Sequence, residues 1–270
     1  MKHAEHVFAI CAYKESPYLE ECIRSLKNQS EKTGVICCTS TPNDHIKNLA
    51  DKYKIPLYIR DGASGIREDW LFAYGQADAD LVTIAHQDDT YGKNYAKTVL
   101  ESYHRYVDMT VFMSDYLTLK VLGESTRLER FNTVWLVKKI LRLPLRFSIF
   151  ADKTFIKRSA VLFGNSVCCP SCTYNKSAVG ADMFHSSYEF ALDWDNLYEL
   201  GGKPGRFVCV EKPLMAYRVH SGATTKECIE DNRRTRDEIA MFEKMWPRPA
   251  VRLLMYFYKK AYKAYDQNVE

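Results

Sequence analysis

The chain has 270 residues, enough for one large α/β domain with a helical appendage and a substantial buried core. Hydrophobic residues make up 46% of it and charged residues 27%, as in an ordinary globular protein. The net charge of +4 permits contacts with nucleotide phosphates or lipid headgroups, but it is far below the basic density of a dedicated nucleic-acid binder.

The amino terminus carries no recognisable signal peptide, and no long uncharged run predicts a membrane-spanning helix. The nine cysteines are scattered, and Cys11, Cys37 and Cys38 fall within apolar runs where a reduced cysteine behaves as a small hydrophobe. These features favour a cytoplasmic location. Peripheral contact with the inner face of a membrane stays open.

Strand and helix patterns alternate through the first 120 residues. Ser16 is the expected N-cap of the first helix and Pro17 its first residue. The predicted strands are residues 6–12, 35–39, 56–59, 81–85 and 109–113, and the predicted helices are residues 17–26, 46–53, 66–77 and 91–106. This alternation predicts a parallel sheet with right-handed crossovers, in which ligands bind outside the carboxyl ends of the strands.

After residue 120 the pattern changes. Residues 134–146 and 252–263 each combine aliphatic and aromatic side chains with Lys and Arg. Both segments fit amphipathic helices packed on the domain, and both also fit helices that lie on an anionic membrane surface. From about Thr224 the chain is helical in character, with a break near Trp246 and Pro247.

Two adjacent carboxylates, Asp88 and Asp89, directly follow the fourth predicted strand. Like charges at close range repel unless a cation lies between them, and hard oxygen ligands suit Mg²⁺ or Mn²⁺. The alternative is that the pair caps a helix that starts near Tyr91. On these residues alone, both interpretations remain open.

Four other polar segments lie near the ends of predicted elements, and together with Asp88 and Asp89 they form a set of motifs with a defined order along the chain. These segments are Ala12-Tyr13-Lys14-Glu15, the turn from Thr39 to Asp44, Asp193-Trp194 and Tyr217-Arg218-Val219-His220. In order and spacing the series resembles that of family 2 glycosyltransferases, over roughly residues 5–222.

The resemblance implies a GT-A fold, an α/β architecture with a Rossmann-like, mostly parallel central sheet flanked by helices. It implies a glycosyltransferase domain over residues 1–222, with a nucleotide-binding half at about 1–120 and an acceptor half at about 121–222. Residues 223–270 are then a C-terminal helical extension. The implied reaction is an inverting transfer from a nucleoside-diphosphate sugar, with UDP the expected nucleotide and Mn²⁺ or Mg²⁺ the expected cofactor.

The resemblance also assigns roles to individual residues. The expected donor nucleotide site consists of Ala12, Tyr13, Glu15, Thr39, Asp44, Arg67 and Asp88. The expected metal ligands are Asp88, Asp89 and His220, with Arg218 as a further cation near the diphosphate. Asp193 is the expected general base, which takes the proton of the acceptor hydroxyl as it attacks the anomeric carbon. Asp195 is a weaker rival, and a helix cap or a surface charge is the alternative role for Asp193.

The chain departs from the family at two places. The family usually has an acidic residue where this chain has His86 or Gln87, and the usual Ala-Arg-Asn segment is replaced by residues 65–70, which contain Arg67. A catalytically silent nucleotide-sugar-binding protein of the same fold is therefore the second hypothesis. A different α/β nucleotide-binding enzyme is disfavoured, because neither a Walker-type loop nor Gly-x-Gly-x-x-Gly follows the first strand.

The expected partners are a nucleotide-sugar donor and a saccharide or lipid-linked saccharide acceptor, in surface polysaccharide or glycolipid synthesis.

Nucleic-acid binding by base stacking on the 18 tyrosines is disfavoured, because the aromatic residues follow core periodicities and no nucleic-acid module is recognisable. Cys169 and Cys172 form a Cys-x-x-Cys pair, but a redox or zinc role needs a strand-to-helix junction or a second pair of ligands.

Overall fold

The computed structural model describes residues 3–123, 125–131, 133–181, 183–220 and 232–266, except for the side chains of 259–266. Two compact units interleave along the chain. Unit 1 comprises Met1–Tyr116, Cys168–Met183 and Gly205–Tyr217, and unit 2 comprises Leu117–Val167, Phe184–Pro204 and Arg218–Glu270. The linear boundaries near residues 120 and 222 stay a prediction.

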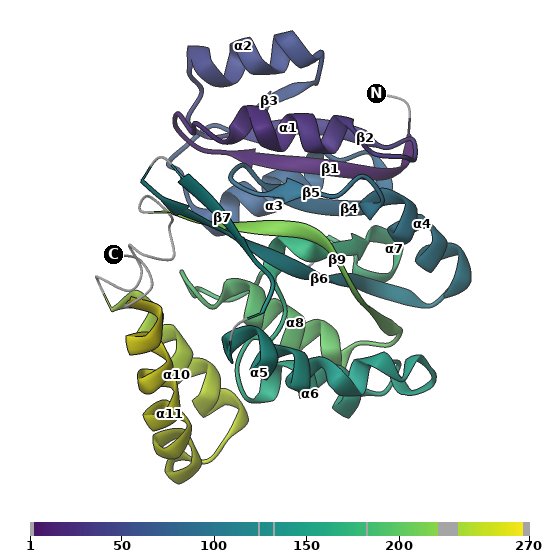
Figure 1. Cartoon of the computed structure of the whole chain (residues 1–270). Helices are drawn as coiled ribbons and strands as arrows, with labels where there is room; N and C mark the ends of the chain where they lie inside the picture. The colour runs from purple at the N-terminus through teal and green to yellow at the C-terminus, as the bar shows by residue number, and fades with distance from the viewer. Residues whose placement is uncertain (1–2, 124, 132, 182, 221–231, 267–270) are drawn as a thin grey trace. The chain divides into compact units, whose positions relative to one another are not determined.

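Unit 1 contains the alternating strands and helices that the sequence predicts (Figure 1). Its elements are β1 (Ala4–Ala12), α1 (Leu19–Lys27), β2 (Gly34–Thr39), α2 (Asp44–Tyr53), β3 (Leu57–Ile59), α3 (Ile66–Gln76), β4 (Ala79–His86), β5 (Thr90–Tyr91), α4 (Tyr95–Arg105), the first part of β6 (Met109–Leu122), the 3-10 helix η3 (Cys169–Ser171), β8 (Cys172–Asn175), α7 (Lys176–Val179) and most of β9 (Arg206–Val219). The predicted α/β class is confirmed.

The described strands form a sheet in the order β3-β2-β1-β4-β8-β6-β9-β5. The first four of these pair in parallel, whereas β8 runs antiparallel to both β4 and β6. Alternate residues of a strand face opposite sides of a sheet. Phe8 and Ile10 accordingly join a core with apolar residues of α1, α2 and α4, and α3 packs along β1, β2 and β4.

Three sequence predictions about helix starts are wrong. The first helix begins at Leu19 rather than Pro17, and its N-cap is Tyr18 rather than Ser16. The Ser16 hydroxyl accepts the Tyr18 N–H at 3.3 Å and donates to Asp88 at 2.7 Å. Tyr91 belongs to the short strand β5, so α4 begins only at Tyr95, after Asn94. Asp88 and Asp89 therefore do not cap a helix at Tyr91, and the capping interpretation is excluded.

Unit 2 is mainly helical. Its elements are the end of β6, β7 (Ser125–Glu129), α5 (Thr133–Arg142), the 3-10 helices η1 (Leu143–Arg146) and η2 (Ser148–Phe150), α6 (Thr154–Leu162), α8 (Leu192–Gly202), α10 (Arg233–Met245) and α11 (Arg248–Asp266). The predicted break at Trp246 and Pro247 is confirmed, and the predicted helical residues 224–231 lie outside the described part of the chain. None of the described helices is long and apolar enough to cross a bilayer.

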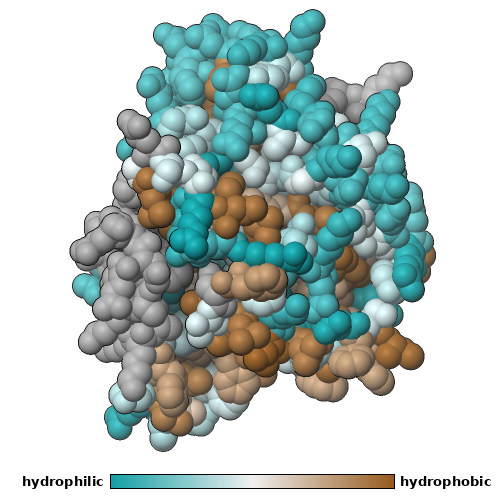
Figure 2. All heavy atoms as spheres, in the orientation of Figure 1, coloured by the Kyte–Doolittle hydropathy of each residue, from teal (hydrophilic) through white to brown (hydrophobic). Residues whose placement is uncertain are grey.

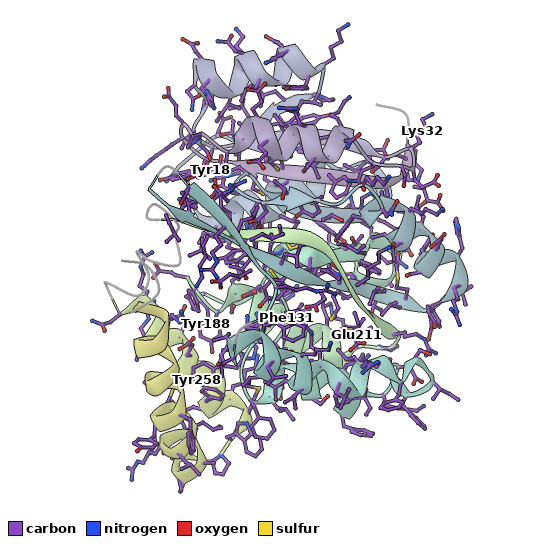
Figure 3. All side chains as sticks on the ribbon, in the orientation of Figure 1. Tyr18, Lys32, Phe131, Tyr188, Glu211 and Tyr258 are labelled. Carbon is purple, nitrogen blue, oxygen red and sulfur yellow. The ribbon has the colours of Figure 1, made fainter. Side chains whose placement is uncertain are left out.

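Tyr258 of α11 belongs to the interior of unit 2. Its ring meets that of Phe242 edge-on at 5.1 Å between centroids, and burial raises the pKa of its phenol (Figure 3). A Cβ on Gly164 would collide with the Tyr258 hydroxyl, which explains a glycine there. This contact fits the interpretation in which residues 252–263 pack on the domain, and the membrane-surface interpretation of the segment stays a prediction. Leu253, Tyr256 and Phe257 are exposed.

Candidate functional site

Three loops of unit 1 leave the sheet at the carboxyl ends of β1, β2 and β4. The strand register pairs Ala12 with Thr39 and Cys11 with His86, so the three strands end at nearly the same level. This edge is where a parallel sheet binds ligands. Tyr18, labelled in Figure 3, lies in the β1 loop, directly before α1.

The loops after β1 and β4 are joined by the side-chain amide of Gln87. Its carbonyl oxygen accepts the Tyr13 backbone N–H at 2.9 Å, and its NH₂ donates to the Tyr13 carbonyl at 3.0 Å. The Gln87 side chain thus bonds both the N–H and the carbonyl of Tyr13, as a residue of a paired strand does. These bonds fix the backbone of the β1 loop. The Tyr13 side chain stays 43% exposed, with the Lys14 ammonium 4.9 Å from its ring centroid.

The β1 and β2 loops are also joined. Lys14 has a left-handed backbone with φ of 51°, which non-glycine residues rarely adopt, and its N–H donates to the Thr41 hydroxyl at 2.7 Å. The Thr41 N–H in turn donates to the Thr39 hydroxyl at 3.0 Å. Thr39 is buried, so its hydroxyl holds the β2 loop against the interior of unit 1. Strained backbone of this kind is common at ligand sites.

Asp88 and Asp89 lie in different surroundings. Asp88 is half-buried, and its carboxylate accepts the Ser16 hydroxyl at 2.7 Å. The Ser16 carbonyl is 3.0 Å from the His45 Nε2, so the loops after β1 and β4 meet the first turn of α2 at this point. Asp89 is only 1% exposed. Of the pair, Asp88 is therefore the more exposed carboxylate.

His86 is the last residue of β4. Its ring stacks on that of Trp70 with centroids 5.2 Å apart, and its Nδ1 is 4.0 Å from Asp89. Burial lowers the pKa of His86 to about 4, against the opposing field of Asp88. The imidazole is therefore neutral at pH 7, and its buried Nε2 makes no hydrogen bond within the described structure.

A second carboxylate, Asp69 on α3, joins the end of β2 to the start of the helix. It accepts hydrogen bonds from the Ser40 hydroxyl at 2.9 Å, the Arg60 Nε at 2.8 Å and the Gly65 N–H at 3.3 Å. Every one of these donors comes from unit 1. The ion pair between Arg60 and Asp69 is mostly buried, so it holds the loop after β3 against α3.

The expected metal ligands Asp88 and Asp89 belong to unit 1, and the third, His220, belongs to unit 2. No three His, Cys, Asp or Glu side chains among the described residues are grouped to hold an ion. Asp88 offers a hard oxygen, but Asp89 is buried and the neighbouring imidazole is not a preferred ligand of Mg²⁺. The cation at Asp88, Asp89 and His220 stays a prediction.

Asp193 lies in unit 2, in the first turn of α8. Its carboxylate accepts hydrogen bonds from the Asn165 side chain and the Trp194 N–H, at 2.7 and 2.8 Å. Burial raises its pKa to about 6, while these hydrogen bonds and the charge of Lys138 act in the opposite direction. Such a carboxyl is ionised at neutral pH yet a better proton acceptor than a surface aspartate.

The rival Asp195 is occupied by a structural contact. It is buried and accepts the Lys244 ammonium of α10 at 2.7 Å. Asp193 is also not the N-cap of its helix, since Ala191 holds that position. Among the described carboxylates of the first turn, Asp193 is therefore the better candidate base.

The remaining predicted residues are placed as follows. Glu15 is exposed, Asp44 is the exposed first residue of α2, and Arg67 is exposed near Glu68 at 3.8 Å. In unit 2, Arg218 is buried and His220 directly follows β9. Their roles at the diphosphate or metal stay predictions.

The sequence did not predict which side chains hold the loops of this edge together by hydrogen bonds: Ser16, Ser40, Thr41, Asp69 and Gln87. Gln87 was singled out only together with His86, as one of two positions at which the resemblance implies an acidic residue. The described cysteines are reduced, and Cys169 lies in a 3-10 turn before β8 rather than at a strand-to-helix junction.

Solved structures of similar fold come from the S. aureus protein TarS. Its 1–349 fragment superposes with a TM-score of 0.58 at 14% identity, covering 80% of this chain and 60% of that one. The same fragment with UDP gives 0.58 at 15%, covering 80% and 61%, and with UDP-GlcNAc 0.56 at 14%, covering 82% and 60%. This chain therefore spans about three fifths of those relatives.

No curated protein matches the chain. The sequence profile for glycosyl transferase family 2 matches residues 7–179, which is more than half of the chain and includes all three loops of the unit 1 edge. The chain therefore belongs to glycosyl transferase family 2.

Proposed function

We propose that the chain is an inverting glycosyltransferase that moves a sugar from a UDP-sugar to a saccharide or lipid-linked saccharide acceptor. The observation that carries the proposal is the interlocked edge of unit 1, where Gln87 and Ser16 join the loops of β1 and β4 around Tyr13 and Asp88. Family membership supports it. So do the TarS structures with UDP and UDP-GlcNAc.

The donor nucleotide is proposed to bind at this edge. The exposed Tyr13 ring offers a face on which a base can stack, and Lys14 adds a positive charge beside it. Asp88 is the carboxylate that reaches the ribose or a cation. Exposed Arg67 is the proposed partner of the diphosphate, since a guanidinium pairs well with phosphate oxygens.

The acceptor is proposed to react at Asp193. Its ionised carboxylate takes the proton from the attacking hydroxyl while the bond between the anomeric carbon and the diphosphate oxygen breaks. The new glycosidic bond forms on the opposite face, so the configuration inverts. The diphosphate leaves with the extra negative charge, which nearby cations stabilise. Mn²⁺ or Mg²⁺ belongs to the proposal as an aid to this departure.

A thermal-shift screen of UDP, GDP, UDP-sugars and GDP-sugars, with and without Mn²⁺, tests donor binding. A ligand that binds the folded state raises its apparent stability by mass action. The expected result is a shift with uridine ligands that Tyr13→Ala reduces. Release of UDP from the bound UDP-sugar then separates an enzyme from the silent binding protein, which shifts in the same way but leaves the donor intact.

A further inference from the structure

The helix α5 of unit 2 turns its apolar side outward. Leu136, Val137 and Ile140, spaced as one face of a helix, are each more than half exposed. Arg142, in contrast, is 5% exposed, and its guanidinium donates to the Ser166 carbonyl at 2.7 Å. A helix packed on its own domain usually has the opposite orientation, with its apolar face inward.

The exposed apolar surface continues through the 3-10 turns that follow. Phe147, Ile149 and Phe150 are 61%, 74% and 52% exposed, and Phe155 at the start of α6 is 70% exposed. At the other end of α5, the ring of Phe131 meets that of Trp135 edge-on at 5.0 Å (Figure 3). Hydrophobic side chains gather in Figure 2 over the region where Figure 1 draws α5 and α6. Apolar patches of this extent mark interaction surfaces.

The same segment is strongly basic. Residues 130–158 contain eight Lys and Arg against one acidic residue, Asp152, and so carry a charge of +7. The whole chain has a charge of +4, so the remainder has a charge of −3. Two of the eight, Arg142 and Lys157, are buried, whereas Arg130, Arg146 and Lys153 are exposed among the apolar side chains. Lys139 lies over the Trp135 ring at 4.7 Å.

We infer that the surface formed by residues 131–155 binds an anionic lipid bilayer, with its apolar side chains in the interface and its lysines and arginines at the headgroups. Aromatic and aliphatic residues flanked by cations are the composition of interfacial helices. A second copy of the chain is a poorer occupant, because a symmetric contact places the same positive patch against itself. The inference rests on the surface alone, and holds whether or not the proposed transfer reaction is correct.

Vesicle flotation of the full chain tests the inference, with phosphatidylcholine vesicles beside phosphatidylcholine–phosphatidylglycerol vesicles. The expected result is binding to the anionic vesicles at about 50 mM NaCl, and at least tenfold weaker binding at about 500 mM NaCl, because salt screens the headgroup charge. The triple variant F147S/I149S/F150S is expected to bind at least tenfold more weakly. The charge variant K139E/R146E is expected to do the same.

Val107→Ser is the matched control, since it removes a 92% exposed apolar side chain from unit 1 and should leave vesicle binding unchanged. Unaltered thermal melting of the variants excludes loss of the fold as the cause. Equal flotation of the wild type and the triple variant overturns the inference. A second result would also overturn it: the wild type sediments as a dimer, the triple variant sediments as a monomer, and neither protein binds vesicles. The surface would then be the contact between two copies of the chain.

Discussion

Asp237 of α10 caps the segment that leads into the helix of Asp193. Its Oδ2 accepts the backbone N–H groups of residues 189, 190 and 191, at 2.8, 2.7 and 3.4 Å, and Ala191 is the N-cap of α8. The side chain is 2% exposed. The same two helices are joined again by Lys244 and Asp195, and by the edge-on contact of Phe242 with Trp194. The position of the proposed base therefore depends on the C-terminal part of the chain.

Replacing Asp237 with alanine leaves several N–H groups without their acceptor. We expect Asp237→Ala to lower the free energy of unfolding by about 2–3 kcal/mol, because buried hydrogen bonds to a charged group are among the stronger ones. Urea denaturation measures this. Glu243→Ala, an exposed position on the same helix, is the control and should change stability by less than about 0.5 kcal/mol. Equal effects of the two changes would exclude the capping role.

The pH dependence of transfer reports on Asp193. Burial raises its pKa to about 6, so the rate should fall about tenfold per pH unit below that value as the base becomes protonated. Asn165→Ala removes a hydrogen bond that favours the ionised form, so its acid limb should move to higher pH. Initial rates between pH 5 and 8 at saturating donor decide this. An identical limb in both proteins contradicts the assignment.

The same shift has a consequence for stability. The folded-state pKa lies above the ordinary aspartate value of 3.8, so the folded protein binds this proton more tightly than the unfolded chain. The contribution of Asp193 to stability is therefore lost as the pH rises from about 4 through about 6. Urea titrations of wild type and Asp193→Asn across this range should show the difference between them changing in that window. A difference that is constant with pH would mean that Asp193 does not titrate there.

Gln87 is expected to act on donor binding. Gln87→Ala breaks both hydrogen bonds to the Tyr13 backbone and should raise the KM for the donor roughly tenfold, with a smaller effect on kcat. Gln87→Glu keeps the acceptor for the Tyr13 N–H but places a carboxylate oxygen against the Tyr13 carbonyl, so it should not restore affinity. Steady-state kinetics with varied donor measures both. An unchanged KM in the alanine variant contradicts the proposed role of the loop.

Asp88 and Asp89 should respond differently to substitution. Asp88 is half-buried at the ligand edge, so Asp88→Asn should abolish most of the transfer while the melting temperature changes little. Asp89 is 1% exposed, so Asp89→Asn should lower stability by about 1–3 kcal/mol. Thermal melting and transfer assays on both variants test this. Equal stability losses would place the two carboxylates in the same environment, against the structure.

Local signals predicted the first half of the fold well. Apolar runs and helical spacing located β1 to β4 and α1 to α3 within a few residues, because the core of unit 1 is built from those faces. The two-residue strand β5 was missed, since its pairing with β9 depends on residues more than 120 positions away. The insertion of β8 between β4 and β6, antiparallel to both, has the same cause.

The candidate site was predicted in part. Strand-end positions pointed to Tyr13 and Asp88, because ligands of parallel sheets bind at that edge. The different burial of Asp88 and Asp89 could not be seen, since adjacent residues carry the same sequence signal. The capping by Asp237 was equally hidden, because Asp237 lies 46 to 48 positions after the residues whose N–H groups it accepts.

The most direct measurement is transfer of sugar from a UDP-sugar to acceptor by the wild type and by Asp193→Asn, with donor binding followed in parallel. The expected result is UDP release coupled to product of inverted configuration in the wild type. In the variant, donor binding should persist while the rate falls roughly 10²-fold or more. Near-normal turnover by Asp193→Asn, or a wild type that binds the donor and never cleaves it, would contradict the proposed enzyme.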